Sequence, residues 1–152
     1  ERKEHEITQL HFIGWPDHGA LAPLHLLALI QAVRAVQPSA VPTPIWVHCS
    51  AGIGRSGTLI GTLFAQEEPI LSSTNQSSIE TTANITAHMR KFRPGSVQSV
   101  GQFLAMAHAI GSLRSEKGSD LHQAEVEAST LGARQPSAWT RRFRMLSKKA
   151  RR

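Results

Sequence analysis

The sequence of 152 residues is poor in thiols and in apolar runs, and each shortage limits what the chain can be. A single cysteine, Cys49, excludes a disulfide bond within the chain and favours a reducing compartment. No run of about 18 apolar residues occurs, so the sequence predicts no membrane-spanning helix. The stretch ERKEHEITQL at the start also lacks the apolar centre of a signal peptide. We therefore expect a cytoplasmic protein.

The net charge of +6 is concentrated in one part of the chain. Residues 1–114 carry 8 lysines and arginines against 7 acidic residues, whereas residues 115–152 carry 9 against 4. The apolar pattern also fades after Ser115, so we expect residues 115–152 to form a disordered basic tail. Because the excess charge lies in that tail, it does not indicate a nucleic-acid-binding domain.

Residues 137–152 of the tail allow a second interpretation. On a helix, four apolar residues would share one face among basic side chains, namely Trp139, Phe143, Leu146 and Ala150. Such a helix could contact an anionic membrane surface or a partner, and the same basic residues could act as a nuclear import signal. A solvated tail is the simpler interpretation, because charge runs are commonly disordered.

Residues 1–114 predict one α/β domain, because strand-like and helix-like segments follow one another along the chain. Two segments favour strands. Residues 6–15 mix β-formers with polar residues, and residues 45–48 form a short apolar run after a proline-rich loop. We expect the second strand to be fully buried, as in a parallel sheet.

Helices are predicted where apolar residues recur at helical spacing, over residues 24–37, 56–66, 79–92 and from 100 onward. Pro23 suits the first turn of the first of these helices. Ser77 or Ser78 can cap the third helix, and Ser99 can cap the fourth. The buried face of the fourth is expected to hold Val100, Phe103, Ala107 and Ile110.

The run HCSAGIGRSG at residues 48–57 places the cysteine between the second predicted strand and the second predicted helix. Gly52 and Gly54 permit a tight turn, in which successive backbone amides point inward and form a nest for an anion. The helix adds the positive end of its dipole, and Arg55 adds a planar fork of donors. We therefore predict a phosphate-binding loop formed by Ser50, Ala51, Gly52, Ile53, Gly54 and Arg55.

Cys49 lies at the bottom of this predicted nest, where the same donors would stabilise a thiolate. We expect its pKa to fall from about 8.5 into the range of roughly 3.5–7.5 that electropositive sites produce. A thiolate that faces a phosphoryl group is a nucleophile. We expect Ser56 to offer a hydroxyl to the sulfur, and His48 to tune the Cys49 thiol through hydrogen bonding. The alternative is a small, buried, unreactive cysteine, and the glycines and the arginine argue against it.

The stretch VHCSAGIGRSGT resembles the signature loop of the protein tyrosine phosphatases. The pattern of cysteine, five residues and arginine also occurs in dual-specificity and lipid phosphatases. The sequence SAGIGRSG, however, is similar to the loop of the tyrosine-specific branch. The resemblance implies that Cys49 attacks phosphotyrosine and forms a phosphocysteine, while Arg55 and the loop amides hold the phosphate oxygens.

The stretch GWPDHG at residues 14–19 resembles the mobile acid loop of that family. A carboxylic acid at Asp17 could protonate a departing phenolate, and Gly14 and Gly19 could absorb the backbone change as the loop closes. Trp15 and His18 would shape the loop. The alternative is an ordinary turn, with Trp15 as part of the core.

The stretch SVQSVGQF at residues 96–103 resembles the glutamine loop of the same family. The resemblance assigns Gln98 to orienting the water that hydrolyses the phosphocysteine, with Gln102 assisting. It places Ser99 where the family usually has threonine and Phe103 where an aromatic residue is usual. The alternative is that the two glutamines lie on a solvated helix face.

The resemblance covers about residues 6–113 and corresponds to the C-terminal part of the family's catalytic domain. It implies a partial tyrosine-phosphatase fold over residues 1–114, with a central mixed sheet flanked by helices and the N-terminal portion of the domain missing. That portion would carry several strands and the loop whose aromatic side chain sandwiches the phosphotyrosine ring. The chain would then be a fragment of a longer protein or a truncated gene model.

Three functions therefore stay open. The first is hydrolysis of phosphotyrosine in proteins through a phosphocysteine intermediate, as part of signalling. The second is a truncated, weakly active or inactive remnant that binds phosphoryl groups or partners, and the third is a dual-specificity or lipid phosphatase. No cofactor or metal is expected, because Arg55 and the amide nest supply positive charge and the histidines show no metal-site spacing. The expected partners are phosphotyrosine-containing proteins, and not nucleic acid.

Overall fold

The computed structural model describes residues 4–37, 44–66, 75–115 and 143–151. The chain divides into two compact units. One consists of residues 1–14 and 123–152, and the other runs from Trp15 to His122. Each unit is described by itself below.

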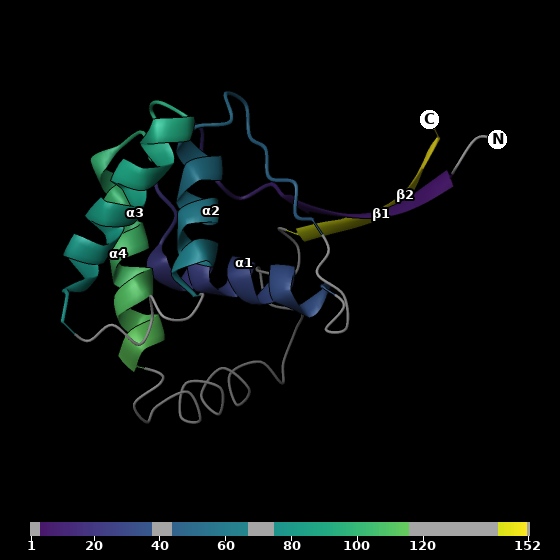
Figure 1. Cartoon of the computed structure of the whole chain (residues 1–152). Helices are drawn as coiled ribbons and strands as arrows, with labels where there is room; N and C mark the ends of the chain where they lie inside the picture. Colours follow the sequence, from purple (N-terminus) through teal and green to yellow (C-terminus); the bar gives the residue numbers. More distant parts are fainter. Residues whose placement is uncertain (1–3, 38–43, 67–74, 116–142, 152) are drawn as a thin grey trace. The chain divides into compact units, whose positions relative to one another are not determined.

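The smaller unit contains a two-stranded antiparallel sheet (Figure 1). Strand β1 (Glu4–Phe12) pairs with strand β2 (Phe143–Arg151), with Glu4 opposite Arg151 and Phe12 opposite Phe143. The strand predicted over residues 6–15 is therefore confirmed in part, with its end at Phe12. Over Phe143–Arg151 the structure differs from both interpretations of the tail, since these residues form neither a helix nor a disordered segment.

Hydrogen bonding between the two strands explains why residues 143–151 form a strand and not a helix. A lone strand leaves its backbone N–H and C=O groups unpaired, and a second strand satisfies them. A short segment can also match helical and strand periodicity at once, so the spacing of its apolar residues does not decide between them. Residues 116–142 lie outside the described residues, so the tail prediction stays a prediction there.

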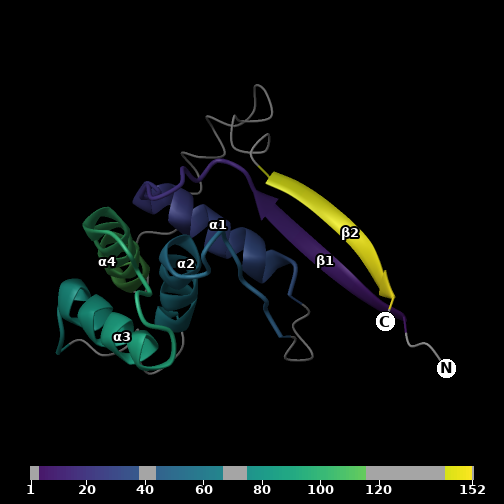
Figure 2. The same ribbon diagram turned by 90° about the horizontal axis from the view of Figure 1, so that it is seen from above.

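The larger unit is built from helices α1 (Pro23–Ala35), α2 (Gly54–Ala65), α3 (Ser78–Phe92) and α4 (Val100–Ser115). In Figure 1 the helices α2, α3 and α4 stand beside one another, and α1 runs crosswise and packs against α4 and α2. Figure 2 shows the same arrangement from above. The four predicted helices are thus confirmed. None of the described helices is long and apolar enough to cross a membrane.

Local signals set the helix starts as the sequence predicts. Pro23 occupies the first turn of α1. The Ser77 hydroxyl accepts a hydrogen bond from the Glu80 backbone amide at 3.2 Å, and the Glu80 carboxylate accepts one from the Ser77 amide at 2.8 Å, which forms a capping box. The Ser99 hydroxyl accepts from the Gln102 amide at 3.2 Å at the start of α4.

The core lies around α4, which packs against the other three helices. Met106 and Ile110 are fully buried there, together with Ala65, Ile85 and Val97. The predicted buried face of α4 is right at Ala107 and Ile110 and partly right at Phe103, but it is wrong at Val100, which is 76% exposed. Val100 is the first residue of α4, where the helix has no preceding turn to cover it.

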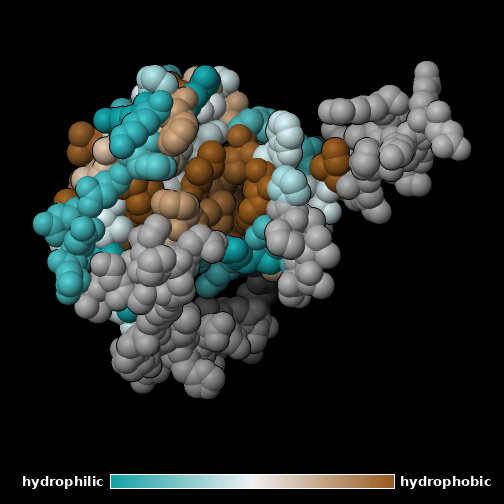
Figure 3. Space-filling view, in the orientation of Figure 1, coloured by the Kyte–Doolittle hydropathy of each residue, from teal (hydrophilic) through white to brown (hydrophobic). Residues whose placement is uncertain are grey.

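The predicted central mixed sheet is absent from the described residues, and the strand predicted at residues 45–48 is wrong. These residues form no regular secondary structure and pair with no other described strand, and Trp46 is 92% exposed. Burial of a short apolar strand requires neighbouring strands, and none of the described segments lies beside it as a strand. Figure 3 shows an apolar hollow beside α2, the helix whose side chains Ile60 and Phe64 are also exposed.

Candidate active site

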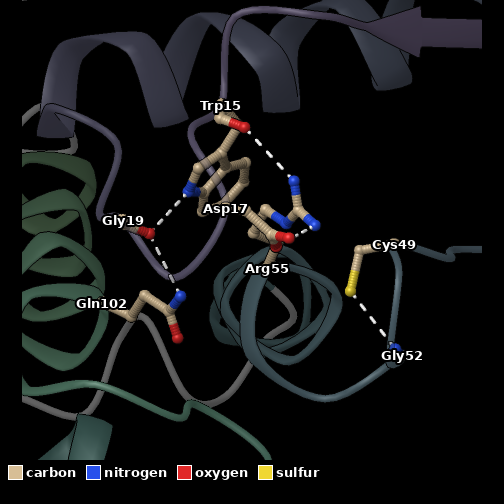
Figure 4. Close-up of polar contacts among 7 residues, drawn as sticks. All are labelled: Trp15, Asp17, Gly19, Cys49, Gly52, Arg55 and Gln102. Carbon is tan, nitrogen blue, oxygen red and sulfur yellow. Dashed lines mark hydrogen bonds and ion pairs between the residues drawn. The ribbon is translucent and has the colours of Figure 1, made fainter.

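A tight loop joins residues 44–48 to the start of α2. It turns at Gly52, whose φ of 69° is a conformation that glycine adopts without strain. The Gly52 amide donates to the Cys49 sulfur at 3.2 Å (Figure 4). Helix α2 begins at Gly54, and Ile53 precedes it with a side chain that cannot cap amides. The amides of the first turn, that of Ser56 among them, and the positive end of the helix dipole therefore lie beside the loop.

A cavity of about 70 Å³ opens at this loop and joins three of the sequence motifs. The cavity is lined by Asp17, His18, Cys49, Ser50, Ala51, Gly54, Arg55, Gln98 and Gln102. The other predicted site residues do not line it, namely Trp15, His48, Gly52, Ile53 and Ser56.

The pKa of the Cys49 thiol is lowered from 9.0 to about 6. Partial burial by itself raises this pKa, but hydrogen bonding with the Ser56 hydroxyl and with the backbone amides of Ser56, Gly52 and Ile53 outweighs that effect. These groups favour the charged form, so the sulfur is largely a thiolate at neutral pH. This is the range that the sequence predicts for an electropositive loop.

The Ser56 hydroxyl is buried at the start of α2, at 2% exposure for the residue. It lowers the pKa of Cys49, yet it has no hydrogen bond of standard geometry to any described group. A buried hydroxyl without such a bond is costly unless a nearby charge interacts with it. The Cys49 thiolate is the charge that can do so. His48, the other predicted neighbour of the sulfur, is exposed.

Arg55 connects the phosphate loop to the acid loop. Its Nη2 lies 2.5 Å from Asp17 Oδ1 in an ion pair, and its Nη1 donates to the Trp15 carbonyl at 3.2 Å (Figure 4). The Asp17 side chain is 62% exposed, whereas that of Arg55 is 22% exposed. The guanidinium and the carboxylate that the sequence singled out therefore meet directly in this structure.

The acid loop is closed on itself by two hydrogen bonds. The Trp15 indole Nε1 donates to the Gly19 carbonyl at 3.0 Å, and the Gly19 amide donates to the Pro16 carbonyl at 3.1 Å. His18 within this loop has a positive φ of 57° and lines the cavity. A Cβ atom on Gly19 would lie 3.0 Å from the Pro16 Cβ, so this glycine is needed for close packing.

The two glutamines differ in their surroundings. Gln102 is 1% exposed, and its Oε1 accepts from the Gln98 amide at 2.9 Å and from the Ser99 amide at 3.3 Å. Its Nε2 donates to the Gly19 carbonyl at 3.1 Å, so Gln102 joins the glutamine loop to the acid loop. Gln98 is exposed and borders the cavity. The interpretation of both glutamines as members of a solvated helix face is wrong for Gln102.

Gly54 allows this glutamine loop to approach the phosphate loop. A Cβ atom at Gly54 would lie 3.0 Å from Gln102 Oε1 and 3.1 Å from Gln98 Oε1. A side chain here would therefore displace both glutamines. The glycine spacing of the motif thus serves packing as well as the backbone turn.

Two arginines near the end of α3 also hold these loops, and sequence reasoning assigned them no role. Arg90 donates from Nε to the Ser96 carbonyl and from Nη2 to the Val97 carbonyl, both at 2.9 Å. Arg93 Nη2 donates to the Ala51 carbonyl of the phosphate loop at 3.0 Å. The one signal in the sequence is the basic run MRKFRPG ahead of the glutamine loop.

Among the described residues, no three His, Cys, Asp or Glu side chains gather in a way that would hold a metal ion. The positive charge at the cavity comes from the Arg55 side chain and the amides of the loop and of α2.

Comparisons with known proteins agree with the motifs. The model of the protein-tyrosine phosphatase family matches residues 1–112. The human tyrosine-protein phosphatase non-receptor type 18 is 31% identical over 114 residues, which are 74% of this chain and 24% of that protein. The rat tyrosine-protein phosphatase non-receptor type 20 is 36% identical over 101 residues, or 66% of this chain and 22% of that protein.

A rat protein named phosphatidylinositol phosphatase PTPRQ is 32% identical over 127 residues, which are 82% of this chain and 5% of that protein. No solved structure matches the chain. The chain thus spans about a quarter or less of the length of these curated relatives. Since the family model covers most of the chain and the loops it shares meet at one cavity, the chain belongs to the protein-tyrosine phosphatase family.

Proposed function

We propose that this chain carries the catalytic loops of an enzyme that hydrolyses phosphotyrosine in proteins through a phosphocysteine intermediate. One observation supports the proposal most: a cavity lined by a cysteine with a pKa of about 6 also contains an arginine and a carboxylic acid. A nucleophile, an oxyanion-binding group and a proton donor are the groups that this reaction requires.

In the first step, the Cys49 thiolate forms a bond to phosphorus as the bond from phosphorus to the tyrosine oxygen breaks. Arg55 leaves its ion pair with Asp17 and, with the loop amides, holds the equatorial oxygens, on which the negative charge is spread. Asp17 gives its proton to the tyrosine oxygen, which leaves as a neutral phenol. The Ser56 hydroxyl interacts with the sulfur and makes it a better leaving group in the next step.

In the second step, water attacks the phosphocysteine, the bond from sulfur to phosphorus breaks, and Asp17 takes a proton from the water. We assign the orientation of this water to Gln98, which is exposed at the cavity. Gln102 is a poorer candidate, because both ends of its carboxamide already bind backbone groups. We assign it to holding the loops together.

The experiment is hydrolysis of para-nitrophenyl phosphate and of a phosphotyrosine peptide by the purified chain. Cys49→Ser is expected to abolish vanadate-sensitive turnover of both. Asp17→Asn removes the general acid, whose contribution is typically about 10²–10⁴ in rate. The loss should be larger for the peptide, because phenolate leaves less readily than nitrophenolate. Equal activity of the Cys49→Ser variant would contradict the proposal.

A second candidate is a remnant that binds phosphoryl groups or partners without turnover. The exposure of Ile45 and Trp46, directly before the phosphate loop, favours it, because the support expected there from a sheet is absent among the described residues. Saturable tungstate binding with a cooperative melt, but without turnover, would favour this candidate over the enzyme.

The substrate class is the remaining alternative, since one relative is named a phosphatidylinositol phosphatase. Turnover of phosphotyrosine peptide should be compared with that of a phosphothreonine peptide and of phosphoinositide micelles. A preference for either of the latter would assign the chain to dual-specificity or lipid substrates.

A further inference from the structure

The peptide unit between Ala51 and Gly52 is held from both sides. The Gly52 amide donates inward to the Cys49 sulfur at 3.2 Å. The Ala51 carbonyl, on the same peptide unit, accepts from Arg93 Nη2 at 3.0 Å. In a trans peptide the N–H and C=O groups point in opposite directions, so a donor that fixes the carbonyl also fixes where the amide points.

A second carbonyl of the loop, that of Ile53, is also held by hydrogen bonds. The Ile53 carbonyl accepts from the Gly57 amide at 3.0 Å and from the Val97 amide at 3.2 Å. The peptide that follows Ile53 is therefore fixed by backbone donors alone. At Ala51 the corresponding donor is a side chain that comes from 42 residues further along the chain.

Arg93 is well placed to act as this donor, because its own backbone is fixed. Its amide donates to the Met89 carbonyl at 2.9 Å, and its carbonyl accepts from the Ser96 amide at 3.2 Å and from the Ser96 hydroxyl at 2.8 Å. The side chain therefore extends from an anchored residue at the end of α3 to the outer side of the loop. Arg93 is itself exposed and does not line the cavity.

We propose that Arg93 is a positioning residue, whose guanidinium holds the Ala51 carbonyl outward and so keeps the Gly52 amide directed at the Cys49 sulfur. Its role is separate from that of Arg55, which faces the cavity. The inference rests on the proposed role of Cys49 as the nucleophile. Its test measures the thiol alone and needs no turnover.

The groups around the sulfur decide which controls the test needs. The titratable or charged groups that face Cys49 or adjoin it are His48, Arg55, Asp17 and His18. All four are left in place in the variants below. Removal of Arg93 also removes a positive charge from the region, so the effect of charge has to be separated from that of the hydrogen bond.

The experiment follows the rate of alkylation of the single thiol by iodoacetamide from pH 4.5 to 9. Iodoacetamide is neutral, so the charge at position 93 does not attract or repel it. The midpoint of the profile is compared, and not the rate at one pH, because a thiolate of higher pKa is also intrinsically more nucleophilic. Each variant is first checked by a thermal melt.

Arg93→Ala is expected to raise the midpoint by about one pH unit, because a hydrogen bond that stabilises a charged group shifts the pKa of that group by about this amount. The rise should persist in 1 M NaCl, where the screening length is about 3 Å and the charge of a distant arginine is suppressed. Arg34→Ala is the matched control, since it removes an exposed arginine of α1 that donates to Gln66. Its midpoint should equal that of the unaltered chain.

The inference is overturned if the Arg93→Ala midpoint equals that of the control, or if its rise disappears in 1 M NaCl. If Arg93→Ala does not fold, Arg93→Met replaces it, because methionine keeps a long apolar side chain but has no N–H donor for the Ala51 carbonyl. A midpoint for Arg93→Met equal to that of the control then overturns the inference. Failure of the proposed function would appear differently, as an absence of phosphate release by a chain whose thiol still has a low midpoint.

Discussion

Replacement of Gln102 by alanine tests whether this side chain connects two loops or only orients a water molecule. The carboxamide makes three hydrogen bonds to backbone groups, of 2.9, 3.1 and 3.3 Å, and the residue is 1% exposed. The alanine variant leaves the Gln98 and Ser99 amides without this acceptor. The Gly19 carbonyl keeps the Trp15 indole as a donor.

A hydrogen bond of this kind contributes about 1 kcal/mol to stability, so the loss of three predicts a decrease of about 3 kcal/mol in the free energy of unfolding. For a unit of about 100 residues this corresponds to a fall in Tm on the order of 10 °C or more. Urea denaturation, followed by the far-UV circular dichroism of the helices, measures the change.

Gln98→Ala is the matched control. Gln98 is exposed, its side chain has no hydrogen bond to another described residue, and its loss should change stability by no more than about 0.5 kcal/mol. The reasoning is refuted if Gln102→Ala is as stable as the unaltered chain, or if the two alanine variants are destabilised equally.

Three further predictions concern other parts of the larger unit. Because the pKa of Cys49 falls from 9.0 unfolded to about 6 folded, its ionisation stabilises the chain above pH 9, and this stabilisation is lost as the pH falls toward 6. Cys49→Ala should therefore flatten stability between pH 6 and 9, measured by denaturation at each pH, and an unchanged slope would contradict this. Gly57→Ala places a Cβ atom 2.8 Å from the Val97 amide nitrogen and should lower the Tm. Gly61→Ala should lower the Tm less, because its Cβ meets the flexible ends of Met106 and Met89, and equal Tm values for the two variants would contradict this packing argument. Ser77→Ala removes the capping box of α3 and should cost about 1 kcal/mol by urea denaturation, with Ser115→Ala as the control; an equal effect of the two would contradict it.

The helices were predictable because their signals are local. Proline at residue 23 and the serines at 77 and 99 mark the starts of three helices within a few residues. Whether residues 45–48 form a strand was not predictable in the same way, because a strand is completed by neighbours from other parts of the chain. The apolar run IWVH predicts burial, but among the described residues no strand lies beside it to provide that burial. Strand β2 was missed for the same reason, since only its pairing with β1 defines it.

In the candidate site, too, the features set by neighbouring residues were predictable and those set by distant residues were not. The loop around Cys49 could be interpreted from ten consecutive residues, because the turn, the amide nest and the arginine are neighbours in sequence. The acid and glutamine loops were found through a family resemblance, and the cavity now joins them to the cysteine. Arg93 could not be found from its neighbours, because its acceptor lies 42 residues away. The separate surroundings of Gln98 and Gln102 likewise depend on contacts that their spacing of four does not specify.

The two hydrogen bonds that close residues 15–19 into a ring have a consequence for the entropy of catalysis. Fixing the backbone of one residue costs roughly 1–2 kcal/mol, and folding has already met that cost throughout the ring. Any approach of Asp17 to a substrate then carries the ring as one body, pivoting about residues outside it and not at Gly19. In the mechanism that we propose, Asp17 would arrive at each turnover on a backbone that is already ordered, without a fresh loss of backbone freedom.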